Sequence, residues 1–408
     1  MASLKKNIGS SFVGNIVYAL SQWLLLIALA KLGGEQIIGV YALALAVVSP
    51  IFSLGNMNLR AVQATDFEIA VSFNSYARFR HLTSLISILV CLLVAAVVYR
   101  NKLDICLSII CLAFYKYFES QSDLVHGYLQ KLERMDLIAY SIMLRGFFNL
   151  IFISSVYYFT HDLVQALAVS IVKSWLIYFV VDARNYRRLY TEQAHLIKTS
   201  LELFKIAWPL GIVIFANTLN LNIPRYFIAE YYDEAILGIF ASISYFIVAG
   251  STLVNAIGQS AIPRLAKYGF ANLGAFRVLS RQVFLLITLV GMVGVLIAEY
   301  LGGFILDLVY TAAIAAYNPL FVQIMWAGVA IYSSTAIGCS LTALRDFKSQ
   351  SVFSMINVLT MLLLSWLLIR DYGLPGAAGA IAITHLVKLL LAWLRVRYLF
   401  QRQSTATS

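Results

Sequence analysis

The stretch that decides the fold is GGEQIIGVYALALAVVSPIFSLGNMNLRAVQATD, residues 33–66. A short polar loop leads into an apolar run that begins at Ile37, is interrupted by Pro50 and has left its apolar phase by Arg60. A helix over 37–56 has about the 20 apolar residues that are needed to cross a bilayer. The stretch therefore predicts a loop followed by a membrane-spanning helix.

A faint copy of this stretch recurs in residues 233–264, DEAILGIFASISYFIVAGSTLVNAIGQSAIPR. In the common register, Glu35 aligns with Glu234 and Asn56 with Asn255. Apolar helices can also resemble one another by composition alone. A repeat of about half the chain predicts two similar lobes, and in a membrane protein it indicates a substrate site between them.

The composition of the whole chain is that of a membrane protein. Of its 408 residues, 61% are hydrophobic and only 12% are charged, about half the charged fraction of a soluble domain. The net charge of +11 does not indicate nucleic-acid binding, because no soluble domain is expected to present a basic face. We predict an all-α polytopic membrane protein with two pseudo-symmetric six-helix bundles around a central cavity.

Apolar runs of spanning length recur along the entire chain. The twelve expected spans are 11–32, 37–56, 82–99, 105–125, 138–159, 163–181, 204–222, 236–257, 283–303, 317–341, 351–369 and 374–394. They group into an N-terminal bundle (1–181), a cytoplasmic linker (182–203), a C-terminal bundle (204–394) and a cytoplasmic tail (395–408).

The basic residues support this arrangement. Of the 30 Lys and Arg residues, 21 fall on one side of the predicted spans, and only five fall on the other: Lys31, Arg100, Lys102, Arg225 and Arg370. Because Lys and Arg are enriched in cytoplasmic loops, the richer side is predicted to be cytoplasmic. Both termini belong to that side.

Four of the predicted spans carry a polar face. Their polar residues recur at the i, i+4 and i+7 positions of a helix. They include Asn15 and Gln22, Asn56 and Arg60, Arg225 with Asn217 nearby, and Asn255. Hydrogen bonding between helices explains any one of them. Four such faces in equivalent spans favour a shared water-filled cavity, because lipid is an unfavourable environment for polar groups.

Charged residues inside spans are stronger indicators, because each is unfavourable in lipid unless it is paired or hydrated. Lys116, Glu119 and Asp123 share one helix face in the fourth span. Lys116 and Glu119 are also spaced as a structural ion pair. Arg145 and Lys173 have no acid nearby on their own helices, which makes them the better candidates for an anionic ligand.

The charged wall of the expected cavity belongs mostly to the N-terminal half. A register that aligns Leu129 with Leu344 places Arg145 opposite Thr360, an uncharged residue. His385 is expected to be a packing residue rather than a proton carrier.

No catalytic constellation stands out in the chain. It has no phosphate-binding P-loop, no Ser/His/Asp arrangement and no metal-ligand spacing. We therefore expect neither an enzyme nor a bound cofactor or metal.

Four segments resemble one known family. LAKLGGEQIIGVYALALAVVSPIFSLGNMNLRAV (29–62), GYLQKLERMDLIAYSIMLRG (127–146), ALRDFKSQSVFSMINV (343–358) and YGLPGAAGAIAI (372–383) are similar in order and spacing to segments of the Wzx-type polysaccharide repeat-unit flippases. These O-antigen and capsule transporters belong to the multidrug/oligosaccharidyl-lipid/polysaccharide exporter superfamily.

The resemblance implies a transport mechanism. It implies alternating access, movement of a polyprenyl-pyrophosphate-linked oligosaccharide from the cytoplasmic to the periplasmic leaflet of the bacterial inner membrane, and coupling to an H⁺ or Na⁺ gradient. Expected partners are this lipid-linked substrate, the membrane lipids, a polysaccharide polymerase and a chain-length regulator. The family also has cationic residues in its cavity, an expectation that Arg145 and Lys116 match by location.

The chemistry of such a substrate fits the polar residues of the spans. Arg and Lys side chains suit a pyrophosphate, and Asn and Gln side chains suit sugar hydroxyls. Glu119 and Asp123 are the candidates for binding the coupling ion. The lipid tail can stay in the bilayer, so that only a polar groove is required.

Two alternatives stay open. A multidrug or small-solute antiporter of the same superfamily would favour acidic and aromatic residues in its cavity, whereas this chain has more cations than anions at depth. A membrane oligosaccharide polymerase usually has a large periplasmic loop, and no such loop is expected here.

Overall fold

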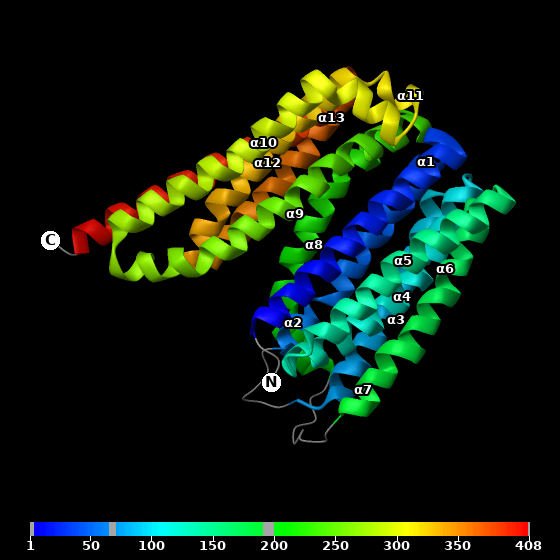
Figure 1. Cartoon of the computed structure of the whole chain (residues 1–408), viewed down its shortest axis with the longest axis horizontal. Coiled ribbons are helices and arrows are strands. Elements are labelled where there is room, and N and C mark those ends of the chain that lie inside the picture. The colour runs from blue at the N-terminus through cyan, green and yellow to red at the C-terminus, as the bar shows by residue number, and fades with distance from the viewer. Residues whose placement is uncertain (1–3, 65–70, 191–199, 407–408) are drawn as a thin grey trace. The chain divides into compact units, whose positions relative to one another are not determined.

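The computed structural model describes residues 4–64, 71–190 and 200–406, which are helical almost throughout and contain no strand (Figure 1). The helices are α1 (Leu4–Asn56), α2 (Leu59–Ala64), α3 (Phe73–Val98), α4 (Leu103–Lys131), α5 (Met135–Thr160), α6 (Leu163–Ile177) with a π-helical turn (Tyr178–Asp182), α7 (Ala183–Leu189), α8 (Ser200–Tyr231), α9 (Glu234–Ala271), α10 (Leu273–Val309), α11 (Ala312–Ala315), α12 (Asn318–Ala343) and α13 (Phe347–Ala406).

Local sequence explains where several helices begin. The side chain of Asp162 accepts a hydrogen bond from the backbone N–H of Val164 (2.8 Å) at the start of α6. Asp233 and Asn272 cap α9 and α10 in the same way. Side-chain oxygens at this position satisfy N–H groups that have no partner within the helix.

Helix α1 contains two segments that meet at Gly34, where φ is 74°. Tyr18 in the first segment donates to Glu119 of α4, and Asn56 at the end of the second accepts from Arg80, which pairs with Asp123 one turn further along α4. An unbroken helix would place residues 18 and 56 about 57 Å apart. The chain therefore folds back at Gly34, as the polar loop in this stretch predicts.

Helix α13 is divided in the same way at Gly373, where φ is 61°. Pro375 follows two residues later and has no N–H to donate. The Tyr232 hydroxyl donates a hydrogen bond to the carbonyl of Ile369 (3.2 Å), and so satisfies a carbonyl at the end of the first segment. Glycine is favoured at both breaks because positive φ is strained for other residues.

The predicted all-α polytopic fold is confirmed. Nine helices in the described ranges are long and apolar enough to cross a membrane. Helices α1 and α13 each hold two predicted spans, and α4, which carries several charges, holds one more. Every predicted span lies on helical residues, with at most one residue outside the helix, but helices such as α3, α8 and α9 extend well beyond the predicted spans.

The chain divides into an N-terminal unit (Met1–Thr218) and a C-terminal unit (Leu219–Ser408), with the division inside α8. Residues 191–199 of the predicted linker lie outside the described residues, and α13 continues through most of the predicted tail. The predicted boundaries at 181, 203 and 394 and the predicted central cavity stay predictions.

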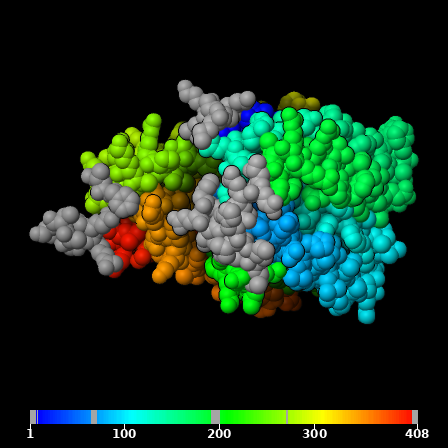
Figure 2. Space-filling view, turned by 90° about the horizontal axis from the view of Figure 1, so that it is seen from below, coloured from blue at the N-terminus to red at the C-terminus, as the bar shows by residue number. Residues whose placement is uncertain are grey.

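Each unit has its own packing centre. In the N-terminal unit, α1 packs against α3, α4 and α5. In the C-terminal unit, α12 packs against α9, α10 and α13. The Arg395 side chain of α13 donates to Asp346 (2.6 Å) just after α12. Figure 2 shows the red end of α13 beside orange residues of the same unit.

Two turns, one in each unit, have the same structure. Leu132 and Leu344 end α4 and α12 with a φ of −83°, and each is followed by a left-handed residue, Glu133 or Arg345. In both turns, the next residue's N–H reaches back to the carbonyl of a leucine, at 2.9 and 3.0 Å. This equivalence is independent structural support for a repeat.

The two turns align Leu132 with Leu344, so the predicted alignment of Leu129 with Leu344 was wrong by three residues. Turn geometry defines the register better than apolar sequence, which varies little from turn to turn. In the corrected register, Lys173 falls opposite His385 and Arg145 opposite Asn357. In this alignment, Lys173 and Arg145 of the N-terminal unit still correspond to a histidine and a neutral residue.

Close packing of α1 on α5 requires a glycine. A Cβ atom at Gly14 would lie 2.9 Å from both the Cα and the Cβ of Ala139. We expect Gly14→Ala to destabilise the N-terminal unit by about 1–3 kcal/mol, because backbone would have to move. Gly9→Ala is the matched control, since no atom lies within 4 Å of its added Cβ.

Thermal unfolding of the purified variants distinguishes these outcomes. The Gly9→Ala variant should be at least as stable as the native protein, because alanine favours a helix more than glycine does. Equal stability of the two variants would contradict the close approach of α1 and α5.

Candidate functional site

A carboxylate between two arginines forms the first part of the site. Asp123 of α4 lies 3.5 Å from Arg60 and 3.4 Å from Arg80, and the Arg80 side chain is fully buried. Arg80 also donates to Asn56, and Arg60 donates through Nε to Gln130 (3.0 Å). We call Asn56, Arg60, Arg80 and Asp123 the Asp123 cluster.

The Asp123 cluster carries one excess positive charge, because two guanidinium groups share one carboxylate. The Nε of Arg80 is buried and has no hydrogen-bond partner among the described residues. A guanidinium suits phosphate oxygens, because its N–H groups form a planar fork. Within the cluster, Arg60 is partly exposed and can reach an anion, whereas Arg80 is fully buried and holds Asp123 and Asn56 in place.

Local backbone brings Arg60 to α4. Met57 and Asn58 both have positive φ (46° and 49°), and these two residues separate α1 from α2. Gly127 of α4 lies against the Arg60 backbone, where a Cβ atom would come within 3.2 Å of the Arg60 Cα. The sharp turn and the small residue together allow Arg60 to approach the carboxylate.

A pocket of about 290 Å³ adjoins the cluster inside the N-terminal unit. The second segment of α1 and one face of α4 line it: Ser49, Phe52, Ser53, Asn56, Lys116, Glu119, Ser120 and Asp123. One of the four predicted polar faces and the predicted charged face of the fourth span thus meet across one pocket. The wider cavity shared by four spans stays a prediction.

Lys116 and Glu119 form the predicted ion pair, with Nζ and Oε2 2.5 Å apart. Tyr18 donates a hydrogen bond to the other oxygen of Glu119 (3.2 Å). Below this pair, the Tyr115 ring lies 5.7 Å from the Lys116 ammonium and 4.9 Å from that of Lys173. Both ammonium groups are close enough for attraction to the ring face.

Arg145 has a buried acidic partner, contrary to the reasoning that singled it out. Its Nη2 lies 2.8 Å from Asp182, and both side chains are almost completely buried. The second oxygen of Asp182 lies 3.3 Å from His126. The acid comes from the π-helical turn after α6, so a search along α5 alone missed it.

Arg145 keeps some capacity to bind an anion. Its Nε and Nη1 atoms are buried without a hydrogen-bond partner in the part of the chain that the structure describes. Lys173, also buried, donates to Asn149 (2.9 Å). The assignment of Arg145 and Lys173 to an anionic ligand stays a prediction.

Of the predicted site residues, only Asn56, Lys116, Glu119 and Asp123 line the pocket; Arg60, Arg145, Lys173 and the remaining candidates do not. Asn15 is exposed on α1, and Gln22 is partly buried with an unpartnered Nε2. Asn217 and Asn255 are also exposed, and they belong to different units. Arg225 donates to Asn222 on its own helix (3.2 Å).

Three residues of the site were not predicted from the sequence: Arg80, Asp182 and His126. Arg80 was counted as a loop charge because the third span was started at residue 82, whereas α3 begins at Phe73. A signal was present, because Tyr76, Arg80, Thr83 and Ser87 recur on one helix face.

No group of His, Cys, Asp and Glu in the described residues could hold a metal ion.

Comparison with known proteins identifies the family. A family model described as polysaccharide biosynthesis protein matches residues 4–269. The chain belongs to this family. The family resemblance drawn from the sequence motifs is thereby confirmed, and this polysaccharide biosynthesis protein is a multi-pass membrane protein.

A curated relative supports the assignment over nearly the full length. The capsular polysaccharide biosynthesis protein CapF of Staphylococcus aureus is 27% identical over 391 residues, which cover 94% of this chain and 97% of the relative.

Solved structures share the fold of this polysaccharide biosynthesis protein. The lipid II flippase MurJ, in an inward closed conformation, matches with a TM-score of 0.74 and 13% identity, covering 94% of this chain and 87% of MurJ. An inward-facing multidrug resistance transporter of the MATE family matches with a TM-score of 0.71 and 12% identity, covering 96% of both chains. At such low identity, these matches show the fold alone.

Proposed function

We propose that this protein transports polyprenyl-pyrophosphate-linked oligosaccharide units across the bacterial inner membrane, from the cytoplasmic to the periplasmic leaflet. The observation that supports the proposal most is the Asp123 cluster, which holds an excess positive charge and an unpartnered guanidinium N–H beside a polar pocket in an apolar bundle. The family assignment and the likeness to a lipid II flippase point the same way.

The substrate's head group matches the pocket's chemistry. Lys116 lines the pocket, and the partly exposed Arg60 adjoins it through Asp123; both offer charge-assisted hydrogen bonds to a pyrophosphate. Ser49, Ser53 and Asn56 offer hydroxyl and amide groups to sugars. The prenyl chain can remain in the bilayer, where it belongs by its apolar character. Alternating access then needs to carry only the polar head across.

Ion coupling is a second part of the proposal. A pyrophosphate that binds Arg60 competes with Asp123 for the same guanidinium, and Asp123 then loses one of its two cationic partners. Glu119 pairs with Lys116 and accepts a hydrogen bond from Tyr18. If Lys116 binds the substrate instead, Glu119 loses its cationic partner in the same way as Asp123. Either released carboxylate is a candidate site for H⁺ or Na⁺.

A polysaccharide polymerase and a chain-length regulator are the proposed partners in the membrane. Both termini lie in the cytoplasm in this proposal, following the distribution of Lys and Arg. The shared fold would also accommodate a multidrug antiporter. Excess positive charge in the Asp123 cluster favours an anionic substrate over a cationic drug.

The proposal is tested in cells that lack the gene. Lectin labelling of spheroplasts and of inverted inner-membrane vesicles reports which leaflet holds the lipid-linked oligosaccharide. We expect accumulation on the cytoplasmic face, relieved by the native gene. Single-repeat intermediates at normal levels on the periplasmic face would contradict it, favouring a polymerase if polymer is missing and another exporter if polymer is normal.

A further inference from the structure

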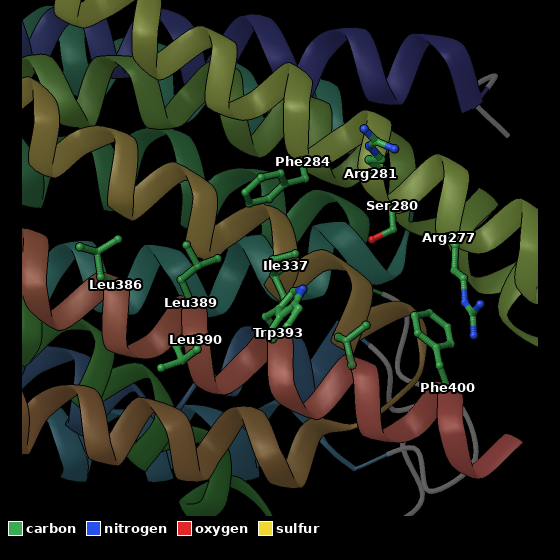
Figure 3. A pocket seen from close by; sticks show the side chains of 11 residues that line it. Arg277, Ser280, Arg281, Phe284, Ile337, Leu386, Leu389, Leu390, Trp393 and Phe400 are labelled. Carbon is green, nitrogen blue, oxygen red and sulfur yellow. The ribbon is translucent and has the colours of Figure 1, made fainter. Parts of the chain in front are cut away.

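An apolar groove of about 530 Å³ lies within the C-terminal unit, far along the chain from the Asp123 cluster. Figure 3 shows its side chains directed between α10 and the second segment of α13. Both helices pack against α12 and scarcely touch each other. Helix α12 forms the floor, where Ser280 of α10 and Ser340 are hydrogen bonded at 2.7 Å.

The groove walls are apolar but not covered by the protein. Leu386, Leu390 and Trp393 of α13 remain 52%, 55% and 45% exposed, and Phe284 faces them from α10. A spanning helix turns such side chains toward lipid. What distinguishes this face is its hollow shape, a groove of about 530 Å³ between α10 and α13.

One end of the groove is strongly basic. Arg277 and Arg281 line this end, and Arg397 lines an adjoining pocket of about 340 Å³. The guanidinium of Arg277 lies 5.1 Å from the ring of Phe400, and that of Arg397 lies 5.4 Å from the ring of Trp393. No ion pair joins these three arginines to an acid within the described ranges.

The dimensions suit one leaflet of a bilayer. The α13 wall from Leu386 to Phe400 is roughly 20 Å long at 1.5 Å per residue. The hydrocarbon core of a bilayer is about 30 Å thick, so the groove reaches from the interface to about the midplane. The basic end lies on the side that the distribution of Lys and Arg predicts as cytoplasmic.

We propose that this groove binds an anionic phospholipid of the cytoplasmic leaflet. Arg277 and Arg281 hold its phosphate, and one acyl chain lies along Leu386, Leu390 and Trp393. Basic pockets between membrane helices on this side suit anionic head groups. The lipid-linked oligosaccharide fits less well, because Ser280 is the one hydroxyl among the lining residues and sugars would find few partners.

Native mass spectrometry of the full-length protein in detergent tests the proposal. The probes are phosphatidylglycerol and phosphatidylcholine with identical chains, and undecaprenyl pyrophosphate. We expect phosphatidylglycerol to bind more tightly than phosphatidylcholine, and the Arg277→Gln/Arg281→Gln double variant to bind it roughly 30-fold more weakly, because each arginine contributes about fivefold.

A matched control separates this site from general charge. Arg264→Gln/Lys267→Gln removes two exposed cations from α9 in the same unit, and it should leave phosphatidylglycerol binding unchanged. Equal loss in both double variants would overturn the proposal. Displacement of phosphatidylglycerol by equimolar undecaprenyl pyrophosphate would also overturn it and would assign the groove to the substrate. Dimers of the native protein that are absent from the Arg277→Gln/Arg281→Gln variant would overturn it too, because they would assign the groove to a second copy of the chain.

A second measurement needs no arginine variant to fold. Phosphatidylglycerol brominated along its acyl chain should quench native tryptophan fluorescence more than it quenches Trp393→Phe, whereas brominated phosphatidylcholine should show no such difference. Equal quenching of the native protein and Trp393→Phe by brominated phosphatidylglycerol would place the lipid elsewhere and overturn the proposal.

Discussion

Asp182→Asn is expected to destabilise the N-terminal unit by about 3–5 kcal/mol. The substitution keeps the side-chain volume but leaves the Arg145 guanidinium, only 3% exposed, without its counter-charge. Breaking a buried ion pair by removing one partner has an effect of this size, because the remaining charge has neither water nor a partner. Asparagine keeps only one acceptor oxygen, so His126 and Arg145 cannot both keep the hydrogen bonds that they make to the two oxygens of Asp182.

A thiol-reactive dye reports unfolding of this unit. Cys91 is buried in α3, and changing Cys106, Cys111 and Cys339 to serine leaves it as the single reporter. Asp136→Asn is the matched control, since Asp136 and its partner Arg134 are both about one third exposed. Exposed pairs contribute about 1 kcal/mol or less, so equal effects of the two substitutions would contradict the buried pair.

The double variant Arg145→Met/Asp182→Leu extends this test. Replacing a buried ion pair by apolar residues of similar size is often neutral or stabilising. We expect the double variant to recover most of the stability that Asp182→Asn loses. If it remains folded but fails to transport, Arg145 has a role beyond pairing with Asp182.

Arg60→Ala is expected to reduce transport by about 10-fold to 100-fold while the protein stays folded. Arg60 is 29% exposed, and Asp123 keeps Arg80 as its partner when Arg60 is removed. The substitution weakens the binding of the substrate, because a hydrogen bond to a charged group contributes about 1.5–3 kcal/mol. Stability should change by about 1 kcal/mol or less.

Arg78→Ala is the control for Arg60→Ala. It removes the same charge on the same predicted side, from an exposed side chain. Complementation of polysaccharide production in cells lacking the gene measures both variants. We expect Arg78→Ala to match the native protein and Arg60→Lys to restore part of the activity, since lysine keeps the charge but not the planar fork. Equal activity of Arg60→Ala and the native protein would remove Arg60 from the site.

Helical periodicity was enough to predict one half of the site. The face of the second span that carries Asn56 and the face of the fourth span that carries Lys116, Glu119 and Asp123 were predicted from spacing alone. These two faces meet across the pocket. Apolar runs of spanning length likewise located the helices.

Pairing between distant helices was not predictable in this way. Arg145 pairs with Asp182, which lies on another helix. Asp182 ends the π-helical turn Tyr178–Asp182, whose wider turn does not follow the regular 3.6-residue period. Arg80 was missed for a related reason, because the start of α3 is marked by Ser72 as its N-cap rather than by a change in hydropathy.

Reconstitution of the purified protein into liposomes tests the central proposal most directly. A fluorescent undecaprenyl-pyrophosphate monosaccharide is added to one leaflet, and its arrival in the other is followed by loss of protection from a membrane-impermeant quencher. We predict rapid transfer with the native protein and with Arg78→Ala, and transfer slowed by about tenfold or more with Arg60→Ala. Transfer by the native protein no faster than in empty liposomes, with and without an imposed H⁺ or Na⁺ gradient, would contradict the account.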